Sequence, residues 1–303
     1  MKRVALTGPT GAVGRALIQY CIQNGVEVYA FCRKDSKRIE QIPQHSKVHI
    51  ITCNLSELVD MTWEKEKCDV FFHLGWDATI GEGRNDIGLQ LKNVQYTLDA
   101  VALAKRMGCT AFVGAGSQAE YGRCQEKLNG SVPAFPESAY GAAKLCAGQM
   151  SRMVCEREGI RHVWARILSV YGPGDNDKTL VMCTIQALLV GSRPEFTRGE
   201  QQWDYLYSMD AAKALYLLGA KGIHGKVYCV GSGKTRPLLE YIQMIREQIN
   251  PLAELGIGEI PYNPKQVMYL CADIKELIQD TGFYPEITFE EGIQRTINWM
   301  RNR

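Results

Sequence analysis

The sequence lacks the features that would assign it to a specialised class of protein. None of its apolar runs approaches the ~20 residues that a membrane-spanning helix needs. The formal net charge is only +2, from 35 Lys and Arg against 33 Asp and Glu, so charge gives no case for a nucleic-acid-binding or membrane-surface protein. The basic start at Met1-Lys2-Arg3 leads into only Val4-Ala5-Leu6, too short for a signal-peptide core. We therefore predict a soluble, cytoplasmic protein that binds neither nucleic acid nor membrane.

Paired metal-binding or disulfide-forming side chains are also missing. The 11 cysteines are odd in number and include no Cys-x-x-Cys pair, which indicates reduced thiols in a reducing compartment. Several lie inside apolar segments, as at Cys21, Cys53, Cys146 and Cys229. His45 and His49 are four residues apart, but they follow Pro43 and run into a strand pattern, where residues i and i+4 lie well apart along the chain. We therefore expect no metal site.

What is present is ordinary globular composition, with 46% hydrophobic and 22% charged residues in a chain of 303. That length fits two domains or one large α/β unit. Short strand patterns at 3–6, 27–32, 47–52, 69–74, 110–114 and 162–168 alternate with longer helical patterns at 11–24, 87–107 and 138–158. This alternation predicts an α/β fold, a Rossmann-type doubly wound parallel sheet.

Beyond residue 174 the alternation is looser, and helical patterns at 180–190, 209–218, 238–249, 274–280 and 289–300 are separated by Pro- and Gly-bearing loops. We expect residues 1–170 to form a nucleotide-binding domain, with a later return of 205–232 to its sheet. Residues 171–303 are expected to form mainly a smaller C-terminal substrate-binding lobe.

A glycine motif, Thr7-Gly8-Pro9-Thr10-Gly11-Ala12-Val13-Gly14, lies between the first strand and the first helix. Glycines there allow a tight turn and a close approach of backbone N–H groups to a pyrophosphate, which the helix N-terminus also attracts. The alternative is a glycine-rich turn without a ligand. We favour a dinucleotide cofactor, held by the segment from Gly8 to Gly14, in particular Gly8, Thr10, Gly11, Ala12, Val13 and Gly14.

The second strand ends in Arg33-Lys34, where an NAD site usually has an acidic residue for the ribose 2′-OH. A cation there suits a 2′-phosphate, and arginine binds phosphate in a forked geometry. A solvated charge cluster is the alternative, since Lys37 and Arg38 follow. We predict NADP as the cofactor, with NAD as the alternative.

Tyr140 and Lys144 are four residues apart in a helical pattern, so they share one helix face. A phenol is a poor acid or base at neutral pH, but a neighbouring cation favours the phenolate and brings the pKa into a useful range. A hydroxyl such as that of Ser117 can hold the substrate oxygen that gains or loses the proton.

Together these segments make the chain resemble the extended short-chain dehydrogenase/reductase family, which contains nucleotide-sugar epimerases, dehydratases and ketoreductases. The resemblance spans nearly the whole chain and rests on the following motifs: Thr7-Gly8-x-x-Gly11-x-x-Gly14, Asn54-Leu55, His73-Leu74-Gly75, Asn93, Ser117, Tyr121-Gly122, Tyr140-x-x-x-Lys144, Arg166, Val170-Tyr171-Gly172-Pro173-Gly174, Tyr205 to Asp210 and Phe289 to Ile293.

The resemblance implies roles for these residues. Tyr140 would exchange a proton with a sugar hydroxyl or ketone, Lys144 would bind the nicotinamide ribose and tune Tyr140, and Ser117 would hydrogen-bond the reacting oxygen. Asn54 and Leu55 would line the adenine pocket, and Leu74 and Gly75 would border the cofactor. The nucleotide-sugar would contact Ser117, Gln118, Ser169, Arg198 and Trp203. A homodimer packed through the helices at 87–107 and 138–158 is also implied.

Three departures from the family pattern bear on the reaction. Sugar 4,6-dehydratases carry Asp-Glu after the Ser/Thr, whereas Gln118-Ala119 stands here, which argues against dehydration. Trp203 replaces an Arg that often clamps the substrate diphosphate, and the C-terminal segment 262–265 also lacks an expected Arg. Arg198, Arg236 or Lys265 could substitute.

Our leading hypothesis is an NADP(H)-linked 4-ketoreductase of a nucleotide-sugar, with Tyr140 as general acid/base. A nucleotide-sugar 4-epimerase that recycles bound NAD is the alternative within the family. A reductase of small carbonyl substrates and a non-catalytic NADP-sensing protein are further alternatives, although sensing proteins typically lose the Tyr/Lys pair.

Overall fold

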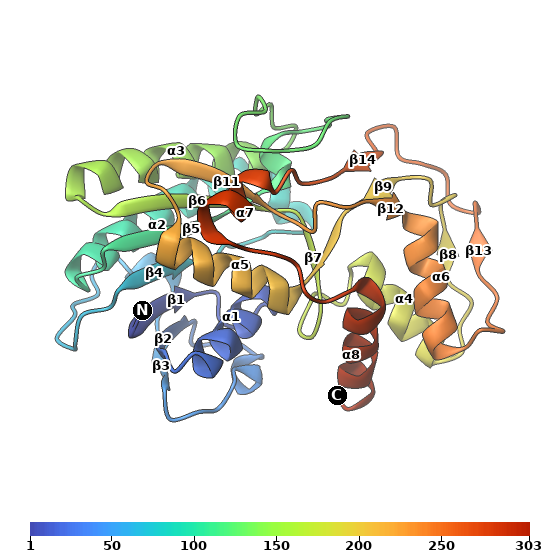
Figure 1. Cartoon of the computed structure of the whole chain (residues 1–303), viewed down its shortest axis with the longest axis horizontal. Coiled ribbons are helices and arrows are strands. Elements are labelled where there is room, and N and C mark those ends of the chain that lie inside the picture. Colours follow the sequence, from blue (N-terminus) through green and yellow to red (C-terminus); the bar gives the residue numbers. More distant parts are fainter.

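The computed structural model describes all of residues 1–303, and a seven-stranded parallel sheet lies at its centre (Figure 1). The strand order is β11-β6-β5-β4-β1-β2-β3. The bounds are β1 Arg3–Thr7, β2 Glu27–Cys32, β3 Val48–Thr52, β4 Val70–His73, β5 Ala111–Ser117, β6 Arg161–Ile167 and β11 Lys226–Val230. Most of these strands are apolar on both faces, as parallel strands covered by helices must be. The predicted Rossmann-type sheet is confirmed.

Helices cover both faces of this sheet (Figure 1). On one face α1 (Ala12–Gln23) packs against α5 (Ser208–Lys221), and α7 (Lys275–Thr281) adjoins α5. On the other face α2 (Ile87–Arg106) packs along α3 (Ala139–Glu158). Residues that alternate along β1 contribute to opposite cores, with Val4 and Leu6 on the α1 side and Ala5 on the α2 side.

The strand order reverses at β1, because the chain runs outward to β2 and β3 and then returns to place β4 on the other side of β1. Crevices beyond the carboxyl ends of strands at such a reversal are the usual ligand sites of open α/β sheets. Short 3-10 helices follow the strands near this edge: η1 Ile39–Gln41, η2 Leu55–Glu57, η3 Glu82–Asn85 and η4 Gln118–Glu120.

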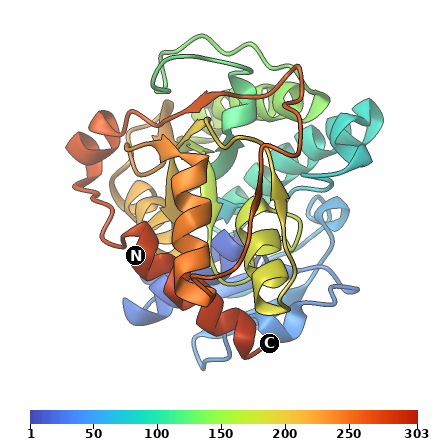
Figure 2. The same ribbon diagram turned by 90° about the vertical axis from the view of Figure 1, so that its right-hand side faces the viewer.

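A second group of helices packs beside the carboxyl edge of the sheet (Figure 2). It comprises α4 (Leu180–Leu189), α6 (Leu238–Ile249) and α8 (Phe289–Arg301), whose apolar side chains share a core with Tyr171 and Tyr207. Small sheets connect this group to the main sheet: β7 (Ser169–Tyr171) with β10 (Tyr205–Tyr207); β12 (Arg236–Pro237), β9 (Gln202–Trp203) and β14 (Tyr269–Leu270); and β13 (Gly256–Ile257) with β8 (Glu195–Phe196).

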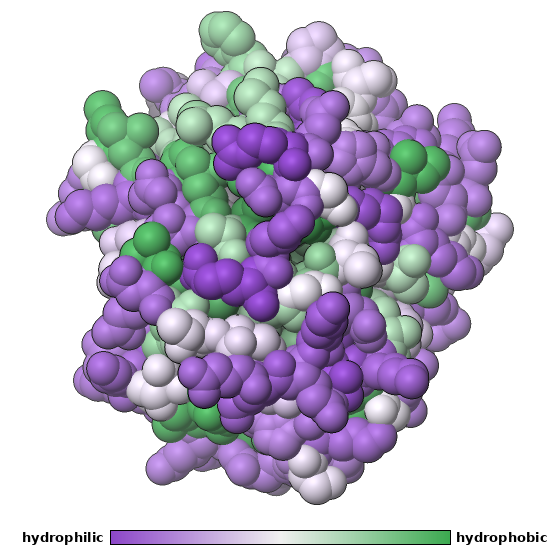
Figure 3. Space-filling model, turned by 90° about the vertical axis from the view of Figure 1, so that its left-hand side faces the viewer, coloured by the Kyte–Doolittle hydropathy of each residue, from purple (hydrophilic) through white to green (hydrophobic).

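The end of the molecule away from this helical group is covered mainly by hydrophilic side chains, with small and separate hydrophobic areas (Figure 3). None of the helices combines the length and apolarity that crossing a bilayer would require. All eleven cysteines are free thiols, and most of them are buried.

Candidate active site

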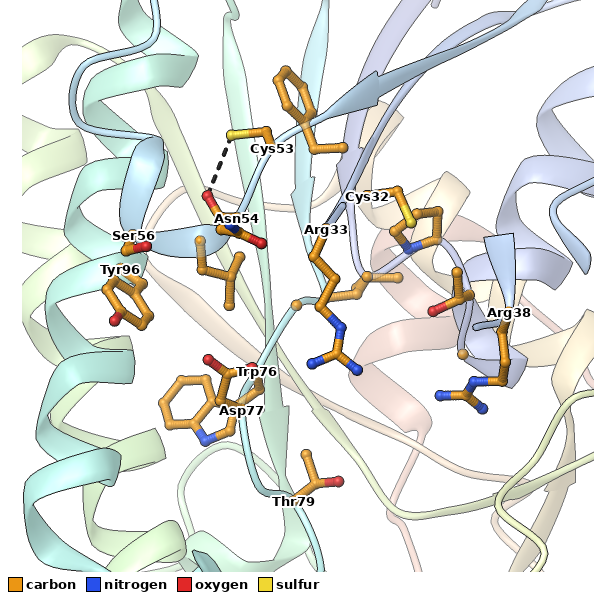
Figure 4. A pocket seen from close by; sticks show the side chains of 18 of the residues that line it. Cys32, Arg33, Arg38, Cys53, Asn54, Ser56, Trp76, Asp77, Thr79 and Tyr96 are labelled. Atoms are coloured by element: carbon orange, nitrogen blue, oxygen red, sulfur yellow. Dashed lines mark hydrogen bonds between the residues drawn. The ribbon is translucent and has the colours of Figure 1, made fainter. Parts of the chain in front are cut away.

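A cavity of about 520 Å³ lies beyond the carboxyl ends of β1, β2 and β4, at the reversal of the strand order (Figure 4). Its walls include the glycine turn and the segments that follow β2, β3 and β4. The residues that matter below are Gly8, Thr10, Gly11, Arg33, Arg38, Asn54, Leu55, Leu74, Gly75 and Trp76.

The glycine turn is shaped so that only glycine fits at two positions. Gly8 has φ +72°, and a Cβ there would stand 2.8 Å from the Gly75 nitrogen, so β1 and the end of β4 approach closely. A Cβ at Gly14 would overlap the carbonyl oxygen of Gly8. No side chain caps the start of α1, so the N–H groups at Ala12 and Val13 are free for an anion. The turn therefore fits a pyrophosphate.

The wall beside the glycine turn, formed by the segment after β4, is held by a buried histidine. The Nδ1 atom of His73 lies 3.0 Å from the Thr7 hydroxyl, which also accepts a hydrogen bond from the Gly75 nitrogen at 3.0 Å. Burial lowers the pKa of His73 to about 3, and the nearby Lys144 acts in the same direction. The imidazole is therefore neutral at physiological pH, and its contact with the Thr7 hydroxyl holds the ends of β1 and β4 together.

Two arginines reach the cavity from the segment after β2. Arg33 and Arg38 both line it, and Figure 4 shows their guanidinium groups on the same side of the cavity. Lys34 does not line it, because its ammonium group faces Glu57 at 3.6 Å. Asp35 also borders the cavity, 3.9 Å from Arg33. No individual role was predicted for Arg38 from the sequence, although its position in the basic run after β2 could have indicated that it reaches the cofactor cavity.

The other end of the cavity suits a flat base. Asn54 and Leu55 line it together with Phe31, Cys53 and Tyr96. Asn54 begins η2, and its backbone nitrogen donates to the Glu57 carboxylate at 2.7 Å, which fixes the turn after β3. The residues predicted at an adenine pocket thus lie on one wall.

The Tyr/Lys pair lies on the first two turns of α3, which begins at the N-cap Ser138. Both side chains are buried. The Lys144 ammonium donates to the Ala115 carbonyl at 2.7 Å and lies 3.7 Å from the centre of the Trp76 ring. Burial lowers the pKa of Lys144 to about 7, although the charge of Glu120 opposes that shift. Burial raises the pKa of Tyr140, whereas the Ser117 side chain and the charge of Arg84 act against this rise.

Ser117 is held in place by a buried ion pair that sequence reasoning missed. The Glu120 carboxylate accepts from the Ser117 nitrogen at 2.8 Å, from the Trp164 indole at 3.0 Å and from the Arg166 guanidinium at 2.6 Å. The Ser-x-x-Glu spacing of a capping box was the signal that could have revealed it. Glu120 thereby orients the turn that carries Ser117.

Trp76 lies between the cavity and the Tyr/Lys pair. It lines the cavity, and its ring meets that of Tyr140 edge-on with centres 6.0 Å apart. Ser117, Tyr140 and Lys144 themselves do not line the cavity. Trp76 lines the cavity and also contacts Tyr140 and Lys144, so it connects the predicted cofactor residues to the predicted catalytic pair.

Only some of the predicted substrate-binding residues lie close to one another in the structure. The Trp203 indole donates to the Ser169 hydroxyl at 2.7 Å, and Trp203 borders a second cavity of about 320 Å³ together with Gln201 and Tyr205. Gln118 lies in η4, directly after Ser117.

None of the three cations considered as substitutes for the missing arginines lines either cavity. Arg236 faces Glu290 at 3.3 Å, and Arg198 and Lys265 are exposed. None of these three cations is therefore placed at either cavity, where it could hold a substrate diphosphate.

Comparisons with known proteins agree with this geometry. The sequence pattern of the family described as "NAD dependent epimerase/dehydratase family" matches residues 4–231. The dTDP-glucose 4,6-dehydratase of Haemophilus influenzae is 24% identical over 99% of this chain and 98% of that relative. The UDP-N-acetylglucosamine 4-epimerase of Methanobrevibacter ruminantium superposes with a TM-score of 0.89 at 23% identity, covering 99% of this chain and 98% of that one.

A UDP-glucose 4-epimerase of Thermotoga maritima gives a TM-score of 0.87 at 20% identity, with 99% of each chain covered. At such identities the solved structures establish the fold, whereas the sequence match covers most of the chain, including the glycine turn, Ser117 and the Tyr/Lys pair. The chain therefore belongs to the NAD-dependent epimerase/dehydratase family, whose members modify nucleotide-sugars.

Proposed function

We propose that this protein is an NADP(H)-dependent reductase of a nucleotide-linked 4-keto sugar. The observation that carries the cofactor choice is the pair of guanidinium groups, from Arg33 and Arg38, on one side of the cavity (Figure 4). Two arginines match the charge and planar geometry of a 2′-phosphate. Asp35 is the acidic residue beside Arg33, and its proximity to Arg33 offsets its charge.

The cavity fits the cofactor on grounds of shape as well as charge. Gly8 and Gly14 lie so close to neighbouring backbone that neither position has room for a Cβ, so the turn is tight. No side chain caps the start of α1. When bound, the cofactor would supply the hydride. The turn from Gly8 to Gly14 would hold the pyrophosphate, the arginines the 2′-phosphate, and Asn54 and Leu55 the adenine.

The chain's own residues would then manage the proton. The Tyr140 hydroxyl gives its proton to the substrate ketone oxygen as the carbonyl carbon becomes an alcohol carbon, and the resulting phenolate is stabilised by neighbouring cations. The Ser117 hydroxyl holds the same oxygen. Burial lowers the pKa of Lys144. Lys144 therefore releases its proton more readily than an exposed lysine and can help to return a proton to Tyr140.

The relatives are named for reactions other than the proposed ketone reduction. Several relatives are 4,6-dehydratases, including that of Haemophilus influenzae, and several neighbours in structure are 4-epimerases. Elimination of water needs a free acid/base beside the ketone, but Gln118 and Ala119 follow Ser117, and the nearest carboxylate, Glu120, is committed to Arg166. We therefore retain a reductase, with a 4-epimerase as the second candidate.

Solved neighbours contain NAD, among them a UDP-glucuronic acid 4-epimerase of Bacillus cereus, which supports the epimerase alternative. Incubation with a nucleotide 4-keto sugar separates the two reactions. A reductase oxidises one NADPH for each sugar reduced. An epimerase interconverts nucleotide-sugars with no net change in NADPH absorbance, and that result would replace our proposal. Turnover of small carbonyl compounds alone, or no turnover with tight NADP binding, would favour the two remaining alternatives.

The cofactor preference is tested by binding. Arg33→Ala and Arg38→Ala should each weaken NADPH binding by about tenfold or more, the value of one charge-assisted hydrogen bond, and leave NADH binding unchanged. Lys34→Ala is the matched control, since Lys34 faces Glu57 instead of the cavity. Equal NADPH affinities for wild type and both arginine variants would refute the assignment.

We also propose that residues 1–170, together with the later return of 205–232 to the main sheet, act as the cofactor lobe and that 171–303 form mainly the substrate lobe. We further propose that the protein is a homodimer. Exposed apolar residues support the dimer: Ile87 and Leu91 on α2, and Met150 and Met153 on α3. Light scattering during gel filtration should give twice the chain mass, and Leu91→Asp should reduce it to a monomer. A wild-type monomer would refute this part.

A further inference from the structure

The segment between β4 and α2 encloses Tyr140 on the side away from α3. Its residue Trp76 meets the Tyr140 ring edge-on. Its residue Arg84 places the guanidinium carbon 4.2 Å from the centre of the same ring. The Arg84 side chain is also anchored, because it donates to the Thr79 carbonyl at 2.6 Å.

Two buried amides of α2 hold this segment in shape. The Gln90 side chain accepts from the Trp76 indole at 2.8 Å and donates to the Ala78 and Gly83 carbonyls at 3.1 and 2.9 Å. The Asn93 side chain accepts from the Asp77 nitrogen at 2.8 Å. Both amides are almost fully buried. Arg84 is therefore carried on a braced segment instead of a free surface loop.

The charges that face Tyr140 come from three elements. Arg84 lies over the ring from the β4–α2 segment, Lys144 comes from α3 itself, and Glu120 comes from η4. The Lys144 ammonium is 5.8 Å from the centre of the Tyr140 ring, whereas it is 3.7 Å from that of Trp76 and bonds the Ala115 carbonyl. Arg84 is thus the cation nearer to the centre of the Tyr140 ring, and Glu120 is the opposing charge.

We propose that Arg84 is a positioning residue of the proton-transfer site: it holds the Tyr140 ring against α3 and stabilises the phenolate left after the proton has moved. The inference deepens the proposed function, since it concerns the same tyrosine. Arginine keeps its charge at every relevant pH and stacks its plane on aromatic rings. The phenolate would therefore have a permanent counter-charge, whereas burial makes the charge of Lys144 depend on pH.

The pKa shifts agree with this geometry. Burial is the largest influence on Tyr140 and raises its pKa, and the charge of Arg84 lowers it. Removal of that charge should therefore raise the pKa further. An opposite charge within ~4–6 Å lowers a pKa by about 1–3 units, and the half-buried position of Arg84 places the expected change near the lower end.

The test is a titration that needs no substrate. Protein labelled at the tyrosine Cζ carbon gives one NMR resonance for each of its 14 tyrosines, and loss of a resonance in Tyr140→Phe identifies that of Tyr140. Arg84→Gln should raise the Tyr140 pKa by about one unit, and Arg84→Lys, which keeps a cation, by less. Lys92→Gln is the matched control, because it removes one positive charge from an exposed position on α2.

Several results would overturn the proposal. The first is an Arg84→Gln protein whose Tyr140 titrates as in wild type, and the second is a Lys92→Gln protein with an equal shift. The third is a wild-type Tyr140 that stays a phenol up to the highest pH at which the fold persists. If Arg84→Gln fails to fold, Arg84→Met, which also removes the charge, takes its place, and an unchanged Tyr140 pKa in that variant also counts against the proposal. Because the titration is done without substrate, absence of ketoreductase activity would refute the proposed function and leave this result standing.

Discussion

His73 should make the stability of this protein fall as the pH drops below 6.5. Its imidazole is buried between Thr7 and Thr97, and burial lowers its pKa to about 3. The unfolded chain binds this proton below about pH 6.5, whereas the folded chain does so only below about 3. Between those values the unfolded state binds more protons, so the free energy of unfolding decreases as the pH falls.

The magnitude follows from the same two values. At pH 5 the unfolded histidine is almost fully protonated and the folded one is not, which lowers the free energy of unfolding by about 2 kcal/mol relative to pH 8. Below pH 3 the loss reaches its limit of about 5 kcal/mol. His73 is 2% exposed, so solvent screening does little to reduce these figures.

Urea unfolding followed by tryptophan fluorescence at pH 8 and pH 5 measures the effect. His73→Gln keeps a side chain that can bond Thr7 but does not titrate. Between the two pH values, wild type should lose about 2 kcal/mol more of its free energy of unfolding than this variant. His45→Gln, at an exposed position before β3, controls for the removal of a histidine. If wild type and His73→Gln lose the same free energy of unfolding between pH 8 and pH 5, the reasoning is refuted, whatever the variant's stability at pH 8.

Two further changes probe the glycine turn and the ion pair beneath Ser117. Gly14→Ala should cost about 1–3 kcal/mol by overpacking and abolish measurable NADPH binding in calorimetry, because the new Cβ would meet the Gly8 carbonyl. Gly88→Ala, at the start of α2, where a Cβ would meet only the Asp86 side chain at an ordinary contact distance of 3.5 Å, should do neither. Glu120→Gln should lower the free energy of unfolding by about 3–5 kcal/mol, since it leaves the buried Arg166 without a counter-charge. Glu137→Gln, which breaks an exposed pair with Arg123, should change it little in the same urea experiment.

The relatives differ in the reaction they catalyse while sharing this fold. The names among them include dTDP-glucose 4,6-dehydratases and UDP-sugar 4-epimerases. One fold can support different reactions because function depends on the few side chains of the site and not on the scaffold. Under the proposed function, we therefore expect the residues after Ser117 and those around Tyr140 to decide this chain's own reaction.

Local chemistry explains why so much could be predicted from the sequence. The parallel sheet follows from apolar strands that alternate with helices, and the predicted helix at 87–107 is observed at Ile87–Arg106. The glycine motif could be recognised because a tight turn with a close approach to β4 tolerates no Cβ. The i, i+4 spacing by itself places Tyr140 and Lys144 on one helix face. Such features depend on residues near one another in the chain.

Contacts between distant segments were decided only in three dimensions. The two-residue strands β9, β12 and β14 carry no periodicity of their own and exist because they pair with one another. Arg38 lines the cavity, whereas the Lys34 ammonium group lies near the carboxylate of Glu57. Glu57 is more than twenty residues from Lys34 in the sequence, so only the folded chain brings the two together. Arg84 lies over Tyr140 because buried amides of α2 shape the intervening segment. The sequence by itself thus determined the fold class and the chemical groups of the site, whereas tertiary packing decided which of those groups face one another.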